Sequence, residues 1–180
     1  DWAGLREREW FGRAQEIAGE KRFFHWELEF PEAFSGEGRG FDVVIGNPPY
    51  LETSKVTTYS VVPMRTTTTN NLFALVCERA VKLGCSDSLI GMIIPNSSVS
   101  AEKMAPLQSE LTTNRCTWIS NYSWRPSKLF EGANMLLAIW VTKRAVSSKC
   151  LSTRYHRWTG EERNGLFQLV RYTDCTKWIS

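Results

Sequence analysis

The pattern of apolar and polar positions along the chain predicts alternating strands and helices. Short runs rich in apolar and β-branched residues indicate buried strands, whereas apolar positions that recur every three or four residues indicate amphipathic helices. The runs predict five strands, at residues 23–30, 41–45, 89–94, 115–124 and 135–142. The helical spacing predicts three helices, at residues 3–20, 71–83 and 100–111. Beyond Cys150 we expect two more short strands, with a turn at residues 161–165.

The order strand, helix, strand between residues 41 and 94 is that of a βαβ unit, whose two strands run parallel. We therefore predict an α/β fold with a mostly parallel sheet, closed at its end by an antiparallel hairpin. The strand at residues 42–46 is expected to lie centrally, beside the strand at residues 89–94. The helix at residues 71–83 is expected to cover one face of the sheet.

Two polar segments flank the first strand of this unit. Residues 31–40 carry glycines at 36, 38 and 40 but precede a strand, so they indicate a flexible linker and not a phosphate-binding loop, which follows a strand and opens a helix. Residues 51–70 are polar and rich in threonine, which suits a long loop that either contacts DNA as a lid or is disordered.

The sequence Gly46-Asn47-Pro48-Pro49-Tyr50 ends the first of these strands abruptly, because two prolines forbid both a helix and a continued ladder. In open α/β sheets, ligands bind just outside the carboxyl ends of the strands. The groups placed there are an amide, two imide carbonyls and an aromatic ring. The Asn47 side-chain oxygen and the Pro48 carbonyl could each accept one N–H of an exocyclic amine, which would turn the nitrogen lone pair toward an electrophile. The ring of Tyr50 could stack on the face of a base that has been flipped out of a duplex.

Asn47-Pro48-Pro49-Tyr50 after a hydrophobic strand resembles the catalytic motif of S-adenosylmethionine-dependent DNA amino-methyltransferases, and the Asn form resembles the N6-adenine enzymes. The string at residues 24–34, the loop and the motif together resemble large methylases of type IIG restriction and phage-exclusion (BREX) systems. The resemblance implies a partial class I, Rossmann-like methyltransferase fold. It implies methyl transfer to a flipped adenine in double-stranded DNA, as part of restriction–modification.

The resemblance also assigns roles to residues outside the motif. A Phe at the position of Phe130 stacks on the flipped base opposite the Tyr, although a core Phe at a hairpin turn is the alternative. An acidic residue followed by an aromatic contacts the cofactor, which points to Glu29 and Phe30, together with Asn47. The glycine loop that holds most of S-adenosylmethionine in the family has no match in this chain, so the chain is expected to be inactive alone.

Composition narrows the alternatives. No Cys or His cluster has the spacing of metal ligands, so no metal site is expected, and Cys77 is expected to be a core residue. No signal peptide or membrane-spanning run is recognisable, which favours a cytoplasmic protein. Residues 121–180 hold ten Lys and Arg against four Asp and Glu. This basic third suits either a DNA-facing segment or a solvated surface.

The predicted organisation is a helical spacer at residues 1–22, the catalytic-side half of a methyltransferase domain at residues 23–145, and the start of an extension toward target recognition at residues 146–180. Two other functions remain open. A protein-glutamine methyltransferase could use the same motif to grip a side-chain amide. A catalytically silent DNA-binding remnant could keep the sheet without the cofactor.

Overall fold

The computed structural model describes residues 4, 6–22, 24–58, 60 and 62–178. They form two compact units, Asp1–Glu37 and Gly38–Ser180, and each unit is treated by itself. The predicted three-part organisation stays a prediction.

The described residues of the first unit form short helices, and none of the side chains in these helices is buried. Its elements are α2 (Glu9–Lys21), α3 (Trp26–Glu29) and α4 (Pro31–Phe34). The helix predicted at residues 3–20 is confirmed over most of its length by α2, while residues 3 and 5 lie outside the described residues.

The strand predicted at residues 23–30 is wrong, because the segment contains the short helix α3; residue 23 lies outside the described residues. Residues four apart face each other on a helix, and the rings of Trp26 and Phe30 stack in this way at 5.9 Å between centroids. The apolar residues at 24–30 thus contact one another within a helical segment, and no strand is needed to explain their spacing. The expected loop at residues 31–40 also begins with a helical turn, since Pro31 occupies the first position of α4, where proline is favoured.

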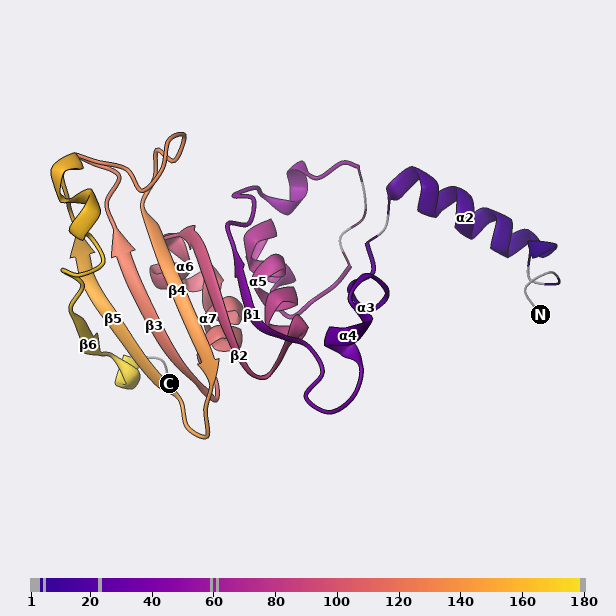
Figure 1. Cartoon of the computed structure of the whole chain (residues 1–180). Coiled ribbons are helices and arrows are strands. Elements are labelled where there is room, and N and C mark those ends of the chain that lie inside the picture. Colours follow the sequence, from indigo (N-terminus) through magenta and orange to yellow (C-terminus); the bar gives the residue numbers. More distant parts are fainter. Residues whose placement is uncertain (1–3, 5, 23, 59, 61, 179–180) are drawn as a thin grey trace. The chain divides into compact units, whose positions relative to one another are not determined.

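The described residues of the second unit form a six-stranded sheet in the order β1-β2-β4-β3-β5-β6 (Figure 1). Pairs β1–β2 and β3–β5 are parallel, and the other three pairs are antiparallel. The strands are β1 (Phe41–Gly46), β2 (Gly84–Pro95), β3 (Arg115–Tyr122), β4 (Leu137–Arg144), β5 (Lys149–His156) and β6 (Tyr172–Asp174). The α/β class, the βαβ unit and the antiparallel pairing of β3 and β4 are confirmed, but these two strands lie inside a mixed sheet and do not close its end.

The central position predicted for the motif strand is wrong. β1 pairs with β2 as expected, but it is the edge strand of the sheet formed by the described residues. Its Val44 packs against the core, whereas Val43 and Ile45, on the opposite face, are 56% and 78% exposed. The apolar pattern predicted a strand that is buried on both faces. In the described residues, only the face of β1 that carries Val44 packs against the core.

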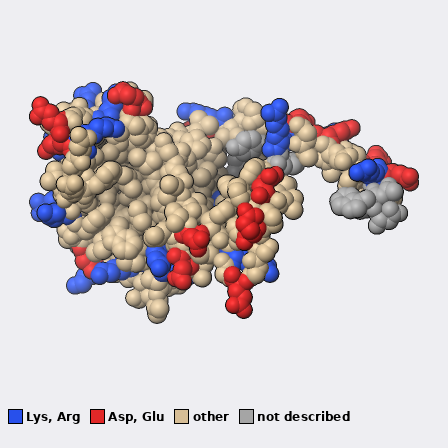
Figure 2. Space-filling model, in the orientation of Figure 1, with Lys and Arg blue, Asp and Glu red and all other residues tan. Residues whose placement is uncertain are grey.

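Helices cover one face of the sheet (Figure 1). They are α5 (Leu72–Leu83), α6 (Ser97–Ser100) and α7 (Ala105–Thr112). Their apolar side chains and those of β2 and β4 form one core, with Phe73, Leu107 and Ile94 among its buried members. The helix predicted at residues 100–111 is interrupted, because α6 ends at Ser100 and a 3₁₀ turn at Glu102–Met104 precedes α7. The other face, seen in Figure 2, is largely uncharged, with Lys and Arg near its margins.

Gly40 does more than supply a flexible linker. Its φ is +122°, and a Cβ at this position would lie 2.6 Å from the Cys85 backbone nitrogen and 2.7 Å from the Leu83 carbonyl oxygen. Only glycine permits this approach without moving the backbone. The start of β1 is thus fitted directly against the junction of α5 and β2.

The threonine-rich segment is anchored at its carboxyl end by the buried carboxylate of Glu78 on α5. Thr66 donates to it from its backbone nitrogen and its hydroxyl, each at 2.9 Å, and Lys82 Nζ lies 2.6 Å away. Thr66 and Thr69 are fully buried, and a 3₁₀ turn occupies Thr67–Thr69. Disorder is therefore excluded for this end of the loop, whereas residues 59 and 61 lie outside the described residues.

Shorter elements complete the unit. The 3₁₀ turn at Gly160–Gly165 matches the turn predicted at residues 161–165, and it begins with a capping box between Thr159 and Glu162. Further 3₁₀ turns lie at Thr53–Lys55 and Thr176–Trp178. The two short strands expected beyond Cys150 are β5 and β6, although β5 already begins at Lys149.

Glu78→Gln should lower the free energy of unfolding by about 1.5–3 kcal/mol, the value of a hydrogen bond to a charged group. Burial alone would raise the pKa of Glu78, but the bonds from Lys82, Thr66 and Arg65 outweigh burial and lower this pKa to about 2. A depressed pKa stabilises the fold above the ordinary value of 4.5 and loses that effect as the pH falls toward 2. Denaturant unfolding at a series of pH values from 7 to 2.5 measures the loss of stability in Glu78→Gln and the pH dependence of the stability of the unchanged chain.

The matched control is Glu102→Gln, which removes the same charge from an exposed position. Its unfolding free energy should change little at any pH. Equal stability of Glu78→Gln and the unchanged chain at pH 7 would contradict the anchoring role.

Candidate active site

The motif after β1 leaves the sheet at the carboxyl end of the strand. Pro48 is buried and holds the turn in place, while Asn47 and Pro49 are exposed and Tyr50 is half-buried. The prolines cannot donate to a ladder, so pairing with β2 stops at Gly46, which is opposite Met92. The exposed amide of Asn47 is thereby placed at the edge of the sheet, as the sequence predicts.

The Tyr50 hydroxyl links the motif to β2. Tyr50 Oη lies 2.6 Å from Asn47 Oδ1 and 3.0 Å from the carbonyl oxygen of Ile93. A phenol has one proton to donate, and the shorter distance favours Asn47 as its acceptor. An amide oxygen has two lone pairs, so Asn47 Oδ1 keeps one acceptor position for a further N–H group.

The environment keeps the Tyr50 phenol protonated. Burial, with a contribution from nearby Cys77, raises the pKa of Tyr50 to about 12. Burial likewise raises the pKa of the Cys77 thiol to about 12. Tyr50 therefore stays a hydrogen-bond donor near neutral pH, and Cys77 is an unreactive core residue, as predicted.

The chain that follows Tyr50 is fastened to the start of α5. The nitrogen of Leu72 donates to the carbonyl of Leu51 at 2.8 Å, and the nitrogen of Thr53 donates to the carbonyl of Asn70 at 3.0 Å. Since Glu78 anchors the segment before α5, its carboxylate indirectly supports the backbone that follows Tyr50.

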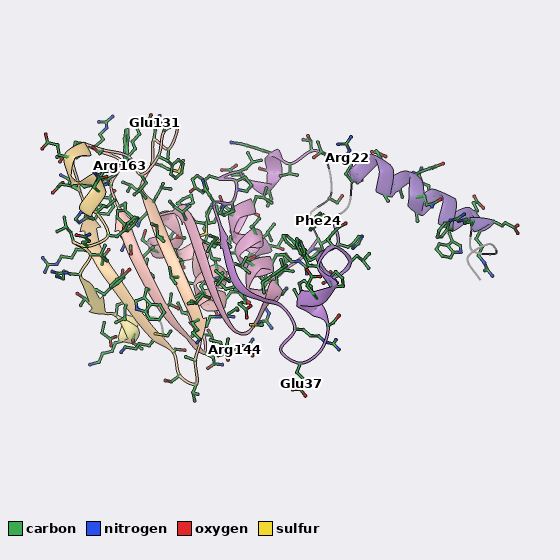
Figure 3. All side chains as sticks on the ribbon, in the orientation of Figure 1. Arg22, Phe24, Glu37, Glu131, Arg144 and Arg163 are labelled. Atoms are coloured by element: carbon green, nitrogen blue, oxygen red, sulfur yellow. The ribbon has the colours of Figure 1, made fainter. Side chains whose placement is uncertain are left out.

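Other loops reach the same edge of the sheet. Leu137, the first residue of β4, pairs with Pro95, the last residue of β2, and with Tyr122, the last residue of β3. Tyr122 in turn pairs with His156, the last residue of β5. These four strand ends therefore lie at the same edge of the sheet. In Figure 3, Glu131 and Arg163 lie at this edge, and Arg144 lies at the opposite one. This carboxyl edge, defined by the ends of β1, β2, β3 and β5 and the start of β4, collects the loops that can meet a ligand.

Phe130 lies in the loop between β3 and β4 and is half-buried. Its neighbour Leu129 packs against the buried cluster of Tyr122, Trp158 and Leu166. Arg163 holds the loop by donating to the carbonyl oxygens of Lys128 and Leu129, at 3.2 and 2.9 Å. The structure thus places Phe130 on a braced loop at the carboxyl edge, and its stacking role stays a prediction.

The two other predicted cofactor contacts belong to the first unit. Glu29 is the last residue of α3, and Phe30 follows it with its ring stacked on Trp26. Asn47 belongs to the second unit. The role of all three toward a cofactor stays a prediction.

Sequence reasoning missed a polar network beside the motif. Asn96 Nδ2 donates to Asn121 Oδ1 at 2.7 Å, and Asn121 Nδ2 donates to Ser152 Oγ and the Thr153 carbonyl, at 3.0 and 2.9 Å. This network ties the ends of β2 and β3 to the middle of β5. Asn121 lies inside the predicted strand at residues 115–124, where a buried amide needs hydrogen-bond partners, and this is the signal that could have revealed the network.

Two searches of the described residues gave negative results. No group of three or more His, Cys, Asp or Glu side chains there is arranged to hold a metal ion. Likewise, no described helix combines the length and the apolar character needed to cross a membrane.

The sequence matches one family model and a curated relative. Residues 3–130 match the model of the Eco57I restriction-modification methylase family. A protein of Methanocaldococcus jannaschii, named provisionally as a type II restriction enzyme and methyltransferase, is 32% identical over 110 residues. That match covers 61% of this chain and 9% of the relative, so the chain spans less than a tenth of the relative's length. The predicted resemblance to restriction–modification methylases is confirmed.

Solved structures share the fold at low sequence identity. A DrdV–DNA complex matches 84% of this chain and 19% of its own, with a TM-score of 0.60 and 11% identity. A nuclease-deletion mutant of the Type ISP restriction-modification enzyme LlaGI, in complex with a DNA substrate mimic, matches 76% of this chain and 17% of its own, with a TM-score of 0.55 and 12% identity. These likenesses support the partial Rossmann-like fold expected from the sequence.

Tyr50 should ionise near pH 12, because burial disfavours the charged phenolate. Ultraviolet difference titration of the unchanged chain against Tyr50→Phe isolates this phenol from the other tyrosines. A midpoint near the ordinary value of 10 would show that Tyr50 is solvated and does not bond as the structure describes.

Proposed function

We propose that this chain, which belongs to the Eco57I restriction-modification methylase family, forms the amine-positioning part of a DNA methyltransferase. The reaction is transfer of a methyl group from S-adenosylmethionine to N6 of an adenine flipped out of double-stranded DNA. The observation that carries the proposal is the exposed amide of Asn47, whose oxygen is held by Tyr50 and keeps one acceptor position at the carboxyl edge.

An exocyclic amine is a poor nucleophile because its lone pair is delocalised into the base. Asn47 Oδ1 and the carbonyl oxygen of Pro48 accept its two N–H groups and draw the hydrogens out of the base plane. The nitrogen lone pair is then localised and points away from the ring. Positive charge develops on this nitrogen as it attacks in line, and the two fixed oxygens stabilise that charge. The nitrogen would form one bond to the methyl carbon while the carbon–sulfur bond breaks and its electron pair stays on the departing sulfur, and the nitrogen would afterwards release one proton to solvent.

The Tyr50 hydroxyl acts on the orientation of the acceptor. Its bond to Asn47 Oδ1 fixes which atom of the amide faces Tyr50, so the opposite lone pair has a defined direction. The half-buried ring of Tyr50 supplies one stacking wall for the base, and Phe130, on its braced loop, supplies the other.

S-Adenosylmethionine supplies an electrophilic methyl group on a positively charged sulfur when it is bound. Among the residues predicted to contact the cofactor, Asn47 carries an exposed amide at the carboxyl edge. Glu29 and Phe30 offer a carboxylate and a ring to the adenine end. The glycine loop that grips the rest of the cofactor is expected elsewhere in the protein.

Asn47→Ala in the full-length protein should lower kcat for methyl transfer by about 10²–10³-fold, the cost of one preorganised transition-state hydrogen bond. DNA binding should fall far less, because the backbone contacts remain. Radiolabelled methyl transfer to DNA measures the rate, and mass spectrometry of the digested nucleosides identifies the product.

The product identity decides between the proposed target and its alternatives. N6-methyladenine supports the proposal, and N4-methylcytosine overturns the adenine assignment. Methylation of a glutamine-containing protein in place of DNA would favour the protein-glutamine enzyme. Asn96→Ala is the matched control, since it removes a neighbouring amide from the network with Asn121 and should leave the kcat of a folded enzyme within about tenfold.

Tyr50→Ala and Phe130→Ala should each weaken capture of the flipped base by about 1–3 kcal/mol, the value of stacking one base on an aromatic side chain. Tyr50→Phe keeps the ring and should lose only about fivefold in rate, because it removes one neutral hydrogen bond to Asn47. A fluorescent base analogue at the target position reports flipping. Unchanged fluorescence with Phe130→Ala would assign Phe130 to packing of the loop.

A further inference from the structure

The ends of β3 and β5 form a hollow at the carboxyl edge that is lined by arginine and aromatic side chains. Its polar and charged members come from two segments that lie side by side because the nitrogen of Ser123 donates to the carbonyl of His156 at 2.8 Å. The residues that line it are Ser123, Trp124, Arg125, Pro126, Leu136, Tyr155 and Arg157.

The two guanidinium groups of this hollow are exposed and uncompensated. Arg125 and Arg157 form no ion pair among the described residues, and no described residue that lines the hollow is acidic. By contrast, Arg163 is used structurally, since its guanidinium donates to two backbone carbonyls. The hollow is therefore a place of positive charge with spare hydrogen-bond donors.

Arg125 is also held in position. Its Cζ lies 4.0 Å from the centroid of the Trp124 ring, so the guanidinium packs on the indole. Ser123 Oγ donates to the Arg125 carbonyl at 2.7 Å and accepts from the Arg125 nitrogen at 3.2 Å, which fixes the backbone. A guanidinium that stacks on a ring keeps its N–H groups free at its rim, and it loses less freedom when it binds an oxyanion.

We propose that this hollow binds the phosphodiester backbone of the DNA that carries the target base, with Arg125 and Arg157 each contacting a phosphate. The inference rests on the proposed DNA methyltransferase function and adds a second point of contact to it. Arginine presents forked donors that match phosphate oxygens. Trp124 and Tyr155 provide the apolar walls against which sugars of the same strand pack.

The position of the hollow sets its distance from the target base. Along the carboxyl edge, β3 is three strands and β5 four strands from β1, which carries Asn47. At about 4.8 Å per strand the separation is about 14–19 Å. Since successive nucleotides rise by about 3.4 Å, the contacted phosphates lie about four to six nucleotides from the flipped base.

A second basic hollow provides the competing location. It lies at the opposite edge of the sheet and is lined by Arg65, Arg115 and Arg144, together with Glu110. Arg65 is paired with Glu110 there at 3.5 Å. Asn47 follows β1 at the carboxyl edge, whereas Arg144, labelled in Figure 3, lies at the opposite edge, so a duplex bound at the motif should not engage Arg144.

The test measures DNA binding by the full-length protein as a function of salt. Each phosphate contact contributes about 0.9 to the slope of log K against log salt concentration. Arg125→Ala with Arg157→Ala should therefore reduce the slope by about 1.8, equally for specific and nonspecific duplexes. The double replacement by Lys keeps both charges and should retain most of the slope.

Arg144→Ala is the matched control, because it removes one exposed arginine from the same sheet at the opposite edge. Its slope should equal that of the unchanged protein. An unchanged slope in the double Ala variant, or a reduced slope in Arg144→Ala alone, overturns the proposal. Far-ultraviolet circular dichroism and a melting curve verify that the variants are folded, and the Lys variant separates charge from packing.

Methyl transfer measured in parallel separates this inference from the proposed function. Arginine-dependent binding without methylation of adenine would contradict the proposed activity and leave the phosphate site standing. Methylation of adenine, together with a salt slope that is unchanged when Arg125 and Arg157 are replaced, would support the proposed activity and contradict the phosphate site.

Discussion

Two consecutive prolines after β1 impose the constraint on which the candidate site depends. They end the parallel ladder with β2 at Gly46, so the chain must leave the sheet where its carboxyl edge is exposed. The turn then has to be held by something other than strand pairing. Three contacts hold it: the hydrogen bond of the Tyr50 hydroxyl, the burial of Pro48, and the hydrogen bond between Leu51 and Leu72. The amide of Asn47 is presented by a fixed backbone even though its side chain is exposed.

The order of the strands in the sheet determines which groups lie at the same edge as the Asn47 amide. All strand ends that meet at the carboxyl edge bring polar or aromatic groups to it, including the Asn96–Asn121 pair, the Phe130 loop and the arginine hollow. These groups are distant in sequence and come together because β4 runs antiparallel between β2 and β3. The sheet thereby brings the Asn47 amide, the Phe130 loop and the arginine hollow to one edge, where we propose that they accept an amine, stack on a base and bind phosphate.

The sequence was sufficient to predict the elements in which local pattern and tertiary burial agree. β1 and α5 were predicted to within one residue, and β4 to within two, because an apolar run or stripe matches a buried face. The strand at residues 23–30 failed because aromatic residues spaced four apart suit a helix as well as a buried strand. Asn47 and Tyr50 were identified from their motif, but the bond between them depends on rotamers, and the arginine hollow depends on how two distant strands pair.

The edge position of β1 has a consequence for how the site is assembled. A strand at the edge of a sheet is a template for another strand, and the exposed Val43 and Ile45 of β1 favour such an addition. A strand that pairs there would fix the twist of β1, which runs straight into Asn47. Addition of a neighbouring strand at this edge would therefore also act on the backbone that presents the Asn47 amide.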